Sequence, residues 1–254
     1  MIGAGITKGT RNLTPDFLTL PDRRLAYQRL RGSPNKIGLL FLGGFASDMM
    51  GTKASFLAER CKSADLSFLR GDYRGHGASS GDFRDGTIGA WLDDACALFD
   101  HLTEGPQIVV GSSMGGWLAL KLALARPDRI KAVIGIAAAP DFTEDLIWQN
   151  LSEENRKTLE QKGELEEYGL VYTKQLIEEG RKHLVLRGAL ANHACPVRLL
   201  QGLKDESVPP DYAFRIADSI GHDDVRVTFI KNGDHRLNRE QDLAALWCLV
   251  GEFV

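Results

Sequence analysis

The chain has 254 residues, of which 43% are hydrophobic and 26% are charged, and its formal net charge is −3 at pH 7. This ordinary composition excludes a disordered chain, and the slight negative charge argues against nucleic-acid binding, which needs a clustered basic face. No apolar run approaches the roughly 18 residues of a membrane-spanning helix. Residues 1–10 have no apolar signal-peptide core. We therefore expect a single cytoplasmic domain that spans residues 1–254.

Short apolar runs alternate with helical patterns from the start of the chain, which is typical of a mostly parallel sheet with helices on both faces. Residues 17–20 and 25–30 flank a turn that contains Pro and Asp, and this pattern predicts an opening hairpin. Continuous apolar runs predict buried strands, and apolar residues at helical spacing predict helices. After the hairpin, we predict strands at residues 37–42, 66–70, 107–110 and 130–138, and helices at residues 53–62, 88–102 and 117–125.

The pattern changes over residues 141–193, where the charge density rises and no buried-strand run occurs. A stretch of this length is too long for a simple loop inside a compact domain. We expect a helical insertion that lies over the sheet as a lid or cap. The alternation then resumes, with strands predicted at residues 197–200 and 225–230 and helices at residues 211–220 and 242–253.

The four cysteines, Cys61, Cys96, Cys195 and Cys248, lie far apart and form no Cys-x-x-Cys pair. Zinc sites need closely spaced ligands, which this pattern lacks. We expect reduced thiols, and we expect neither a metal nor a cofactor.

The segment from Gly111 to Gly115 reads Gly-Ser-Ser-Met-Gly and lies between a predicted buried strand and a predicted apolar helix. In that context, G-x-S-x-G is the nucleophile elbow of α/β hydrolases, a strained turn that presents a serine hydroxyl above the carboxyl edge of the sheet. Gly111 and Gly115 support this crowded turn. Only Ser113 has glycine two positions away on both sides, so we predict Ser113 as the nucleophile and Ser112 as a small residue that fills the turn.

A serine nucleophile needs a histidine base oriented by a carboxylate, and in this fold the chain order is Ser, then Asp or Glu, then His. His235 is the predicted base because it follows the last predicted strand in a Gly-Asp-His turn. His183 and His193 lie in the insertion, where we expect surface or lid roles. His222 lies in a polar turn, where we expect it to be solvated.

Asp205 is the predicted acid because it lies in the loop after the strand at residues 197–200, where a carboxylate can approach the base. Asp141, just past the preceding strand, is the alternative. Asp234, beside the base, is expected to be a turn residue or a support for the histidine loop. The residues do not by themselves exclude Asp141.

The oxyanion that develops during acyl transfer needs two backbone N–H donors. We assign one to Met114, which follows the nucleophile at the start of a helix, and the other to Phe45 in a Gly-Gly-Phe-Ala loop. A further motif, Arg74-Gly-His76-Gly, is expected to be a structural loop that packs beneath the elbow. We expect no catalytic role for His76, since it precedes the serine. Together these features predict the α/β-hydrolase fold, with a mostly parallel eight-stranded sheet, helices on both faces and a helical cap insertion.

Longer segments of the chain resemble the abhydrolase-domain-containing protein 10 family. The most specific are Ser-Asp-Met-x-Gly-Thr-Lys-Ala within residues 45–54 and Gly-Ser-Ser-x-Gly-Gly-Trp-Leu within residues 105–118, and residues 72–79, 195–205 and 234–236 agree. The resemblance runs from about residue 37 onward. It implies an esterase or thioesterase, since the animal members are similar to palmitoyl-protein thioesterases and also cleave acyl-glucuronide esters. The triad that it implies is Ser113, Asp205 and His235, and the Val-Pro ending of the acid loop also favours Asp205 over Asp141.

The chain departs from the mitochondrial members of this family in two ways. It lacks an Arg- and Ser-rich transit segment, and residues 142–193 match far less well. We interpret it as a bacterial-type cytoplasmic member that acts on a small-molecule or acylated-protein ester or thioester. Acyl chain length, leaving group and oligomeric state stay open.

Two alternatives use the same fold. One is a cofactor-free perhydrolase or a hydrolase of carbon–carbon bonds, which differs in reaction but keeps the nucleophile elbow. The other is a binding module without activity. The intact set of Ser113, Asp205 and His235 argues against the binding module, which has no use for a base in register with the serine.

Overall fold

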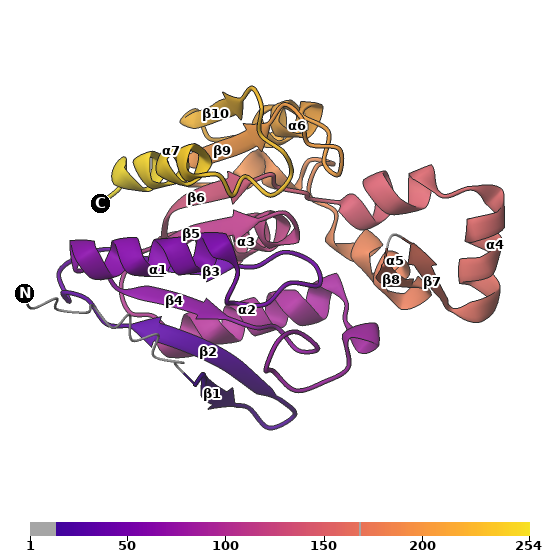
Figure 1. Cartoon of the computed structure of the whole chain (residues 1–254), viewed down its shortest axis with the longest axis horizontal. Coiled ribbons are helices and arrows are strands. Elements are labelled where there is room, and N and C mark those ends of the chain that lie inside the picture. Colours follow the sequence, from indigo (N-terminus) through magenta and orange to yellow (C-terminus); the bar gives the residue numbers. More distant parts are fainter. Residues whose placement is uncertain (1–13, 168) are drawn as a thin grey trace, which may run out of the picture.

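The computed structural model describes residues 14–167 and 169–254. An eight-stranded sheet in the order β1-β2-β4-β3-β5-β6-β9-β10 forms its centre (Figure 1). β1 and β2 pair antiparallel, β2 and β4 pair antiparallel, and every other neighbouring pair in the sheet is parallel. The strands are β1 (Asp16–Thr19), β2 (Arg24–Leu30), β3 (Gly38–Leu42), β4 (Phe68–Gly71), β5 (Gln107–Ser112), β6 (Ile130–Ile136), β9 (Val197–Gly202) and β10 (Val225–Ile230). The predicted α/β-hydrolase sheet is confirmed.

Helices pack on both faces of this sheet (Figure 1). Buried apolar side chains form one cluster on each face, because alternate residues of a strand point in opposite directions. In β3, Leu40 and Leu42 belong to the cluster with α2, α3 and α6, whereas Leu39 and Phe41 belong to the cluster with α1 and α7. The helices are α1 (Thr52–Ala64), α2 (Ile88–Leu102), α3 (Met114–Ala125), α6 (Asp211–Ser219) and α7 (Glu240–Gly251), with short turns η1 (Phe83–Asp85) and η2 (Pro127–Arg129).

Local sequence explains where the helices beside the candidate site begin. α2 begins after Thr87, whose hydroxyl accepts a hydrogen bond from the Ala90 N–H at 3.2 Å, as expected of an N-cap. α3 is apolar on nearly all sides and is correspondingly buried. It begins at Met114, directly after Ser113 and three residues before the predicted start at Trp117.

The insertion leaves the sheet after β6 and returns before β9, and in Figure 1 it extends to the right of the sheet. The expected insertion contains helices, and it also contains an antiparallel hairpin of β7 and β8 that was not predicted. These strands are four residues each, and only Leu165 and Tyr172 are buried in them, so the sequence shows no buried-strand run. The elements are η3 (Thr143–Ile147), η4 (Trp148–Asn150), α4 (Glu153–Lys162), β7 (Glu164–Glu167), β8 (Leu170–Thr173), α5 (Lys174–Gly180), η5 (Arg181–His183) and η6 (Ala189–Asn192).

None of the helices between residues 14 and 254, as far as the structure describes them, has the length and apolar character needed to cross a membrane.

Candidate active site

Ser113 lies in a strained turn between β5 and α3. Its backbone has φ 54° and ψ −119°, a region that residues with a side chain rarely adopt. Three main-chain hydrogen bonds hold the turn. The Ser113 N–H donates to the Ile136 carbonyl at 2.9 Å, and the Ser113 carbonyl accepts from the N–H groups of Gly116 at 2.8 Å and Ala139 at 3.1 Å. The backbone of β6 and the segment after it therefore fixes the position of the serine.

The glycines on either side of Ser113 allow strand and helix to approach closely. A Cβ at Gly111 would lie 2.2 Å from the Gly115 carbonyl oxygen, and a Cβ at Gly115 would lie 2.1 Å from the Leu42 carbonyl oxygen. Both contacts are with main-chain atoms, which cannot rotate away. Ser112 is buried as the last residue of β5. The packing thus requires glycine at both predicted positions.

The structure brings the three predicted triad residues into one chain of contacts. His235 Nε2 lies 3.2 Å from Ser113 Oγ, and His235 Nδ1 lies 2.9 Å from Asp205 Oδ2. The Asp205 side chain is fully buried, whereas the His235 side chain is 30% exposed. A carboxylate only accepts hydrogen bonds, so the ionised Asp205 places the proton of a neutral imidazole on Nδ1 and leaves Nε2 free to accept one from Ser113.

Three further donors hold the Asp205 carboxylate. The N–H groups of Ser207 and Val208 donate to Oδ1 at 2.9 Å and 2.8 Å, and Gln201 Nε2 donates to Oδ2 at 3.1 Å. Hydrogen bonds of this kind stabilise the ionised form of a carboxyl group. The sequence prediction missed Gln201, although a polar residue at the end of an otherwise apolar strand was a usable signal.

Met114 and Phe45, the two residues predicted to donate to an oxyanion, lie beside Ser113. Met114 opens α3 immediately after the serine. A Cβ at Gly44 would lie 3.4 Å from Ser113 Cβ, so the loop that contains Phe45 packs directly against Ser113. Within the part of the chain that the structure describes, neither the Met114 N–H nor the Phe45 N–H donates a hydrogen bond to another residue.

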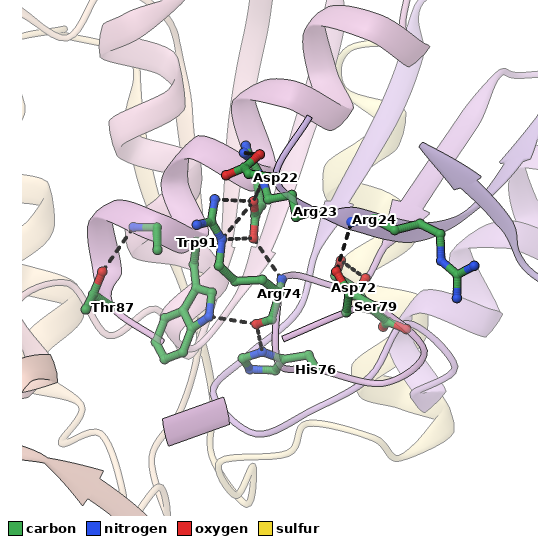
Figure 2. Close-up of polar contacts among 12 residues, drawn as sticks. Asp22, Arg23, Arg24, Asp72, Arg74, His76, Ser79, Thr87 and Trp91 are labelled. Atoms are coloured by element: carbon green, nitrogen blue, oxygen red, sulfur yellow. Dashed lines mark hydrogen bonds and ion pairs between the residues drawn. The ribbon is translucent and has the colours of Figure 1, made fainter. Parts of the chain in front are cut away.

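Polar contacts hold the glycine-rich loop after β4, which contains Arg74 and His76. The Tyr73 hydroxyl donates to the Gly43 carbonyl at 3.2 Å, at the base of the loop that contains Phe45. Arg74 pairs at 2.8 Å with Asp94, whose side chain is fully buried, and the Arg74 carbonyl accepts from Trp91 Nε1 at 3.1 Å. Figure 2 shows Arg74 and Trp91 in this network. These contacts join the glycine-rich loop to the loop that contains Phe45 and to α2.

His76, in the same loop, is buried among aromatic rings. Its Nδ1 lies 3.2 Å from the Arg74 carbonyl (Figure 2). Its ring packs against the rings of Tyr73, Phe83 and Trp91. Burial lowers the pKa of His76. The residue has a packing position within this loop.

The remaining histidines lie outside the triad contacts. His183 pairs with Glu179 within the insertion. His193 is buried, with Nδ1 3.2 Å from the Cys195 carbonyl, so a surface role for it is wrong. His222 is half-buried and accepts from the Asp224 N–H at 3.0 Å, which makes it less solvated than expected.

Asp141, the alternative acid, is bonded to the insertion. Its side chain is fully buried and accepts from the N–H groups of Val185 and Leu186 at 2.7 Å and 3.0 Å. Arg187 Nη1 adds a third contact at 2.6 Å. These partners belong to the segment that returns from the insertion, so the structure gives Asp141 an anchoring position.

Comparison with known proteins places the chain in a family. The family model for serine aminopeptidase, S33, matches residues 34–165. The chain is 40% identical over 240 residues to palmitoyl-protein thioesterase ABHD10, mitochondrial, of Mus musculus, which covers 91% of this chain and 78% of that protein. For the Homo sapiens protein of the same name, the identity is 39% over 248 residues, and the coverage is 94% and 79%. The chain belongs to the ABHD10 family.

Solved structures agree with membership of the ABHD10 family. Mouse α/β hydrolase domain-containing protein 10 superimposes with a TM-score of 0.87 at 38% identity, over 94% of this chain and 97% of that chain. A hydrolase from Agrobacterium vitis S4 gives a TM-score of 0.89 at 36% identity, with the same coverage. This ABHD10-family chain is therefore an enzyme, a serine hydrolase with the α/β-hydrolase fold.

Contacts between aromatic rings join the Phe45 loop of this ABHD10-family chain to its insertion. The Phe45 ring stacks on Tyr172 of β8, with centroids 5.5 Å apart and ring planes 4° apart. It also contacts Phe83, Trp91 and Phe142 at centroid distances of 4.9 to 5.8 Å. The residue that carries one candidate oxyanion donor therefore also packs against the insertion, and the surroundings of the site on this side are apolar.

Proposed function

We propose that this chain hydrolyses carboxylic esters or thioesters through an acyl-enzyme on Ser113. The observation that carries the proposal is the continuous contact from Ser113 Oγ through His235 to the buried Asp205 carboxylate. A hydroxyl is a weak nucleophile unless a neighbouring base accepts its proton. The 3.2 Å contact to His235 Nε2 supplies that base.

The proposed reaction has two acyl-transfer steps. His235 Nε2 accepts the Ser113 proton while Oγ attacks the acyl carbon, and Asp205 stabilises the imidazolium that forms. The N–H groups of Phe45 and Met114 donate to the oxyanion. The carbon–oxygen or carbon–sulfur bond then breaks, and the alcohol or thiol leaves with the proton from His235. Water, deprotonated by His235, attacks the acyl-enzyme and restores the free serine.

A thioester of an apolar acyl group is the substrate class that we favour. The mammalian relatives are named palmitoyl-protein thioesterases, and identity to them extends over most of this chain. The aromatic group around Phe45 supplies an apolar environment beside the nucleophile. The substrate is accordingly a small-molecule or acylated-protein thioester or ester.

Ser113→Ala tests the proposal. We expect this variant to hydrolyse p-nitrophenyl esters and acyl-CoA thioesters about 10³-fold or more slowly, because no other group can form the acyl-enzyme. A fluorophosphonate should modify the folded wild-type protein at Ser113, as located by mass spectrometry of the labelled peptide. Ser112→Ala is the matched control and should keep the label. An unlabelled Ser113, or full turnover in Ser113→Ala, contradicts the proposal.

The cytoplasmic location remains a proposal from the sequence. The names of the mammalian relatives place those proteins in mitochondria. Fractionation of the source cells, with detection of this chain in each fraction, decides between a cytoplasmic location and another compartment.

A further inference from the structure

Lys53, in the first turn of α1, reaches the loop that carries His235. Its Nζ donates to the Arg236 carbonyl at 2.6 Å and lies 3.4 Å from Asn238 Oδ1. Arg236 directly follows His235 in the chain. Lys53 belongs to the Ser-Asp-Met-x-Gly-Thr-Lys-Ala segment, in which the proposed reaction uses no side chain.

The first half of the histidine loop is fixed by other contacts. The Lys204 N–H donates to the Gly233 carbonyl at 2.8 Å. A Cβ at Gly202 would lie 2.4 Å from that same carbonyl oxygen, so the loop begins pressed against the end of β9. Asp234 Oδ1 accepts from the Leu237 N–H at 2.9 Å.

The second half of the loop has a strained backbone and accepts a hydrogen bond from Lys53. Leu237 has φ 45°, which is unfavourable for a residue with a side chain. The main-chain carbonyl before it, that of Arg236, is the acceptor for Lys53. The His235 side chain is 30% exposed, so the backbone that carries it contributes to the position of the ring together with the contacts to Asp205 and Ser113.

The charge on Lys53 strengthens this contact. A hydrogen bond from an ammonium group is roughly twice as strong as one between neutral groups. Burial lowers the pKa of Lys53 to about 8, the Asp234 carboxylate acts to raise it, and the Arg236 guanidinium acts to lower it. Below that pH the ammonium form holds the carbonyl, and above it the neutral amine leaves a weaker bond.

We propose that Lys53 is a positioning residue for His235. Its ammonium group holds the Arg236 carbonyl and thereby keeps the imidazole aligned between Ser113 and Asp205. The inference rests on the proposed function of those three residues, and Lys53 itself touches none of the reacting atoms.

A spectroscopic experiment tests the position of His235 without relying on turnover. The proton in the His235–Asp205 hydrogen bond should give a low-field ¹H resonance, identified by its loss in His235→Gln. We expect Lys53→Met to shift or broaden that resonance. Lys62→Met, an exposed lysine near the end of the same helix, should leave it unchanged. An unaltered resonance in folded Lys53→Met overturns the proposal.

The pH dependence of kcat supplies a second test. At pH 7, we expect Lys53→Met to lower kcat by about tenfold to a hundredfold, as misplacement of a catalytic group does. KM should change less than about twofold, because Lys53 makes no contact with the substrate. Wild-type kcat should fall as the pH rises through about 8. Lys53→Arg should keep its activity beyond that pH, because a guanidinium stays charged.

The outcomes separate this inference from the proposed function. If Ser113→Ala abolishes hydrolysis while Lys53→Met keeps wild-type kcat and the low-field resonance, the positioning role alone fails. If Lys53→Arg loses activity above pH 8 as the wild type does, the role of the ammonium charge fails. If Ser113→Ala keeps full activity, the proposed function fails, and the resonance still decides whether Lys53 positions His235.

Discussion

Gly115 occupies a point where the neighbouring backbone leaves no room for a side chain. A Cβ there would lie 2.1 Å from the Leu42 carbonyl oxygen and 2.5 Å from that of Gly43. We expect Gly115→Ala to lower the free energy of unfolding by about 2 kcal/mol, since overpacking forces the backbone to shift. The variant should also slow ester turnover, because a shift of the backbone at residue 115 would displace the adjacent Met114 N–H, a proposed oxyanion donor. Urea unfolding and p-nitrophenyl ester hydrolysis measure the two effects.

Gly251→Ala is the control for this prediction. Gly251 ends α7, and no atom lies within 4 Å of an added Cβ. Its free energy of unfolding should change by less than about 0.5 kcal/mol. Equal losses in the two variants would show that the elbow tolerates a side chain, against the packing argument.

Individual residues were predictable from the sequence where a local pattern constrains them. The glycine spacing selects Ser113 over Ser112, and chain order selects the Gly-Asp-His turn of His235. Gln201 was missed although its partner Asp205 is only four residues away, whereas Lys53 was not predicted because its partner lies in a distant segment. Lys53 bonds to a carbonyl 183 residues away. No periodicity or spacing along the chain reports such a contact.

Among the elements, the insertion depends on Asp141 where it leaves the sheet. The buried carboxylate binds the N–H groups of Val185 and Leu186, and so ties the start of the insertion to its end. We expect Asp141→Ala to lower the free energy of unfolding by about 2–4 kcal/mol, because donors that were satisfied lose their acceptor. The insertion should also become more sensitive to limited proteolysis. Both effects are measured on the purified protein.

Glu164→Ala is the matched control in the insertion. The ion pair of Glu164 with Arg84 is about half exposed on both sides. Exposed pairs of this kind contribute about 0–1 kcal/mol, so little change is expected. Asp141 does not anchor the insertion if its alanine variant is no more sensitive to protease than this control.

The sheet elements were predicted within a few residues, and the insertion was not. Buried parallel strands read as continuous apolar runs, as in residues 37–42, and α2 matches its predicted bounds. The β7–β8 hairpin is only partly buried and carries Glu164, Glu166 and Glu167. The pairing of β7 with β8 depends on contacts across the hairpin. The high charge density of this segment, without a buried-strand run, favoured a helical interpretation.

At the scale of the whole molecule, one buried cysteine lies in each of the two apolar clusters. Cys61 packs with α1 and α7, and Cys195 packs in the cluster on the other face. Burial raises the pKa of Cys61 to about 12 and that of Cys195 to about 11, so neither forms the reactive thiolate at pH 8. We expect a disulfide reagent to modify exposed Cys248 in the native protein. Cys61 and Cys195 should react only on unfolding.

The same labelling tests the predicted single domain. If both faces of the sheet unfold together, Cys61 and Cys195 should become reactive at the same urea concentration, as peptide mapping would measure. Two separated midpoints would contradict one cooperative unit. The alternation of apolar runs with helical patterns predicted one sheet with helices on both faces. Whether the two apolar clusters unfold together depends on packing between distant segments, which no local sequence pattern contains.

Phe45 takes part in both the candidate site and the packing of the insertion, and this has a consequence for selectivity among acyl groups. Its N–H is a proposed oxyanion donor, and its ring is stacked on Tyr172 of the insertion. An acyl group that pushes the insertion outward must separate the Phe45 and Tyr172 rings. The Phe45 N–H, the proposed donor to the oxyanion, would then lose its fixed position. A poorly fitting substrate would then be bound yet cleaved slowly. Discrimination among acyl groups would lie in kcat more than in KM, because the contact with the insertion and the proposed oxyanion donor belong to one residue.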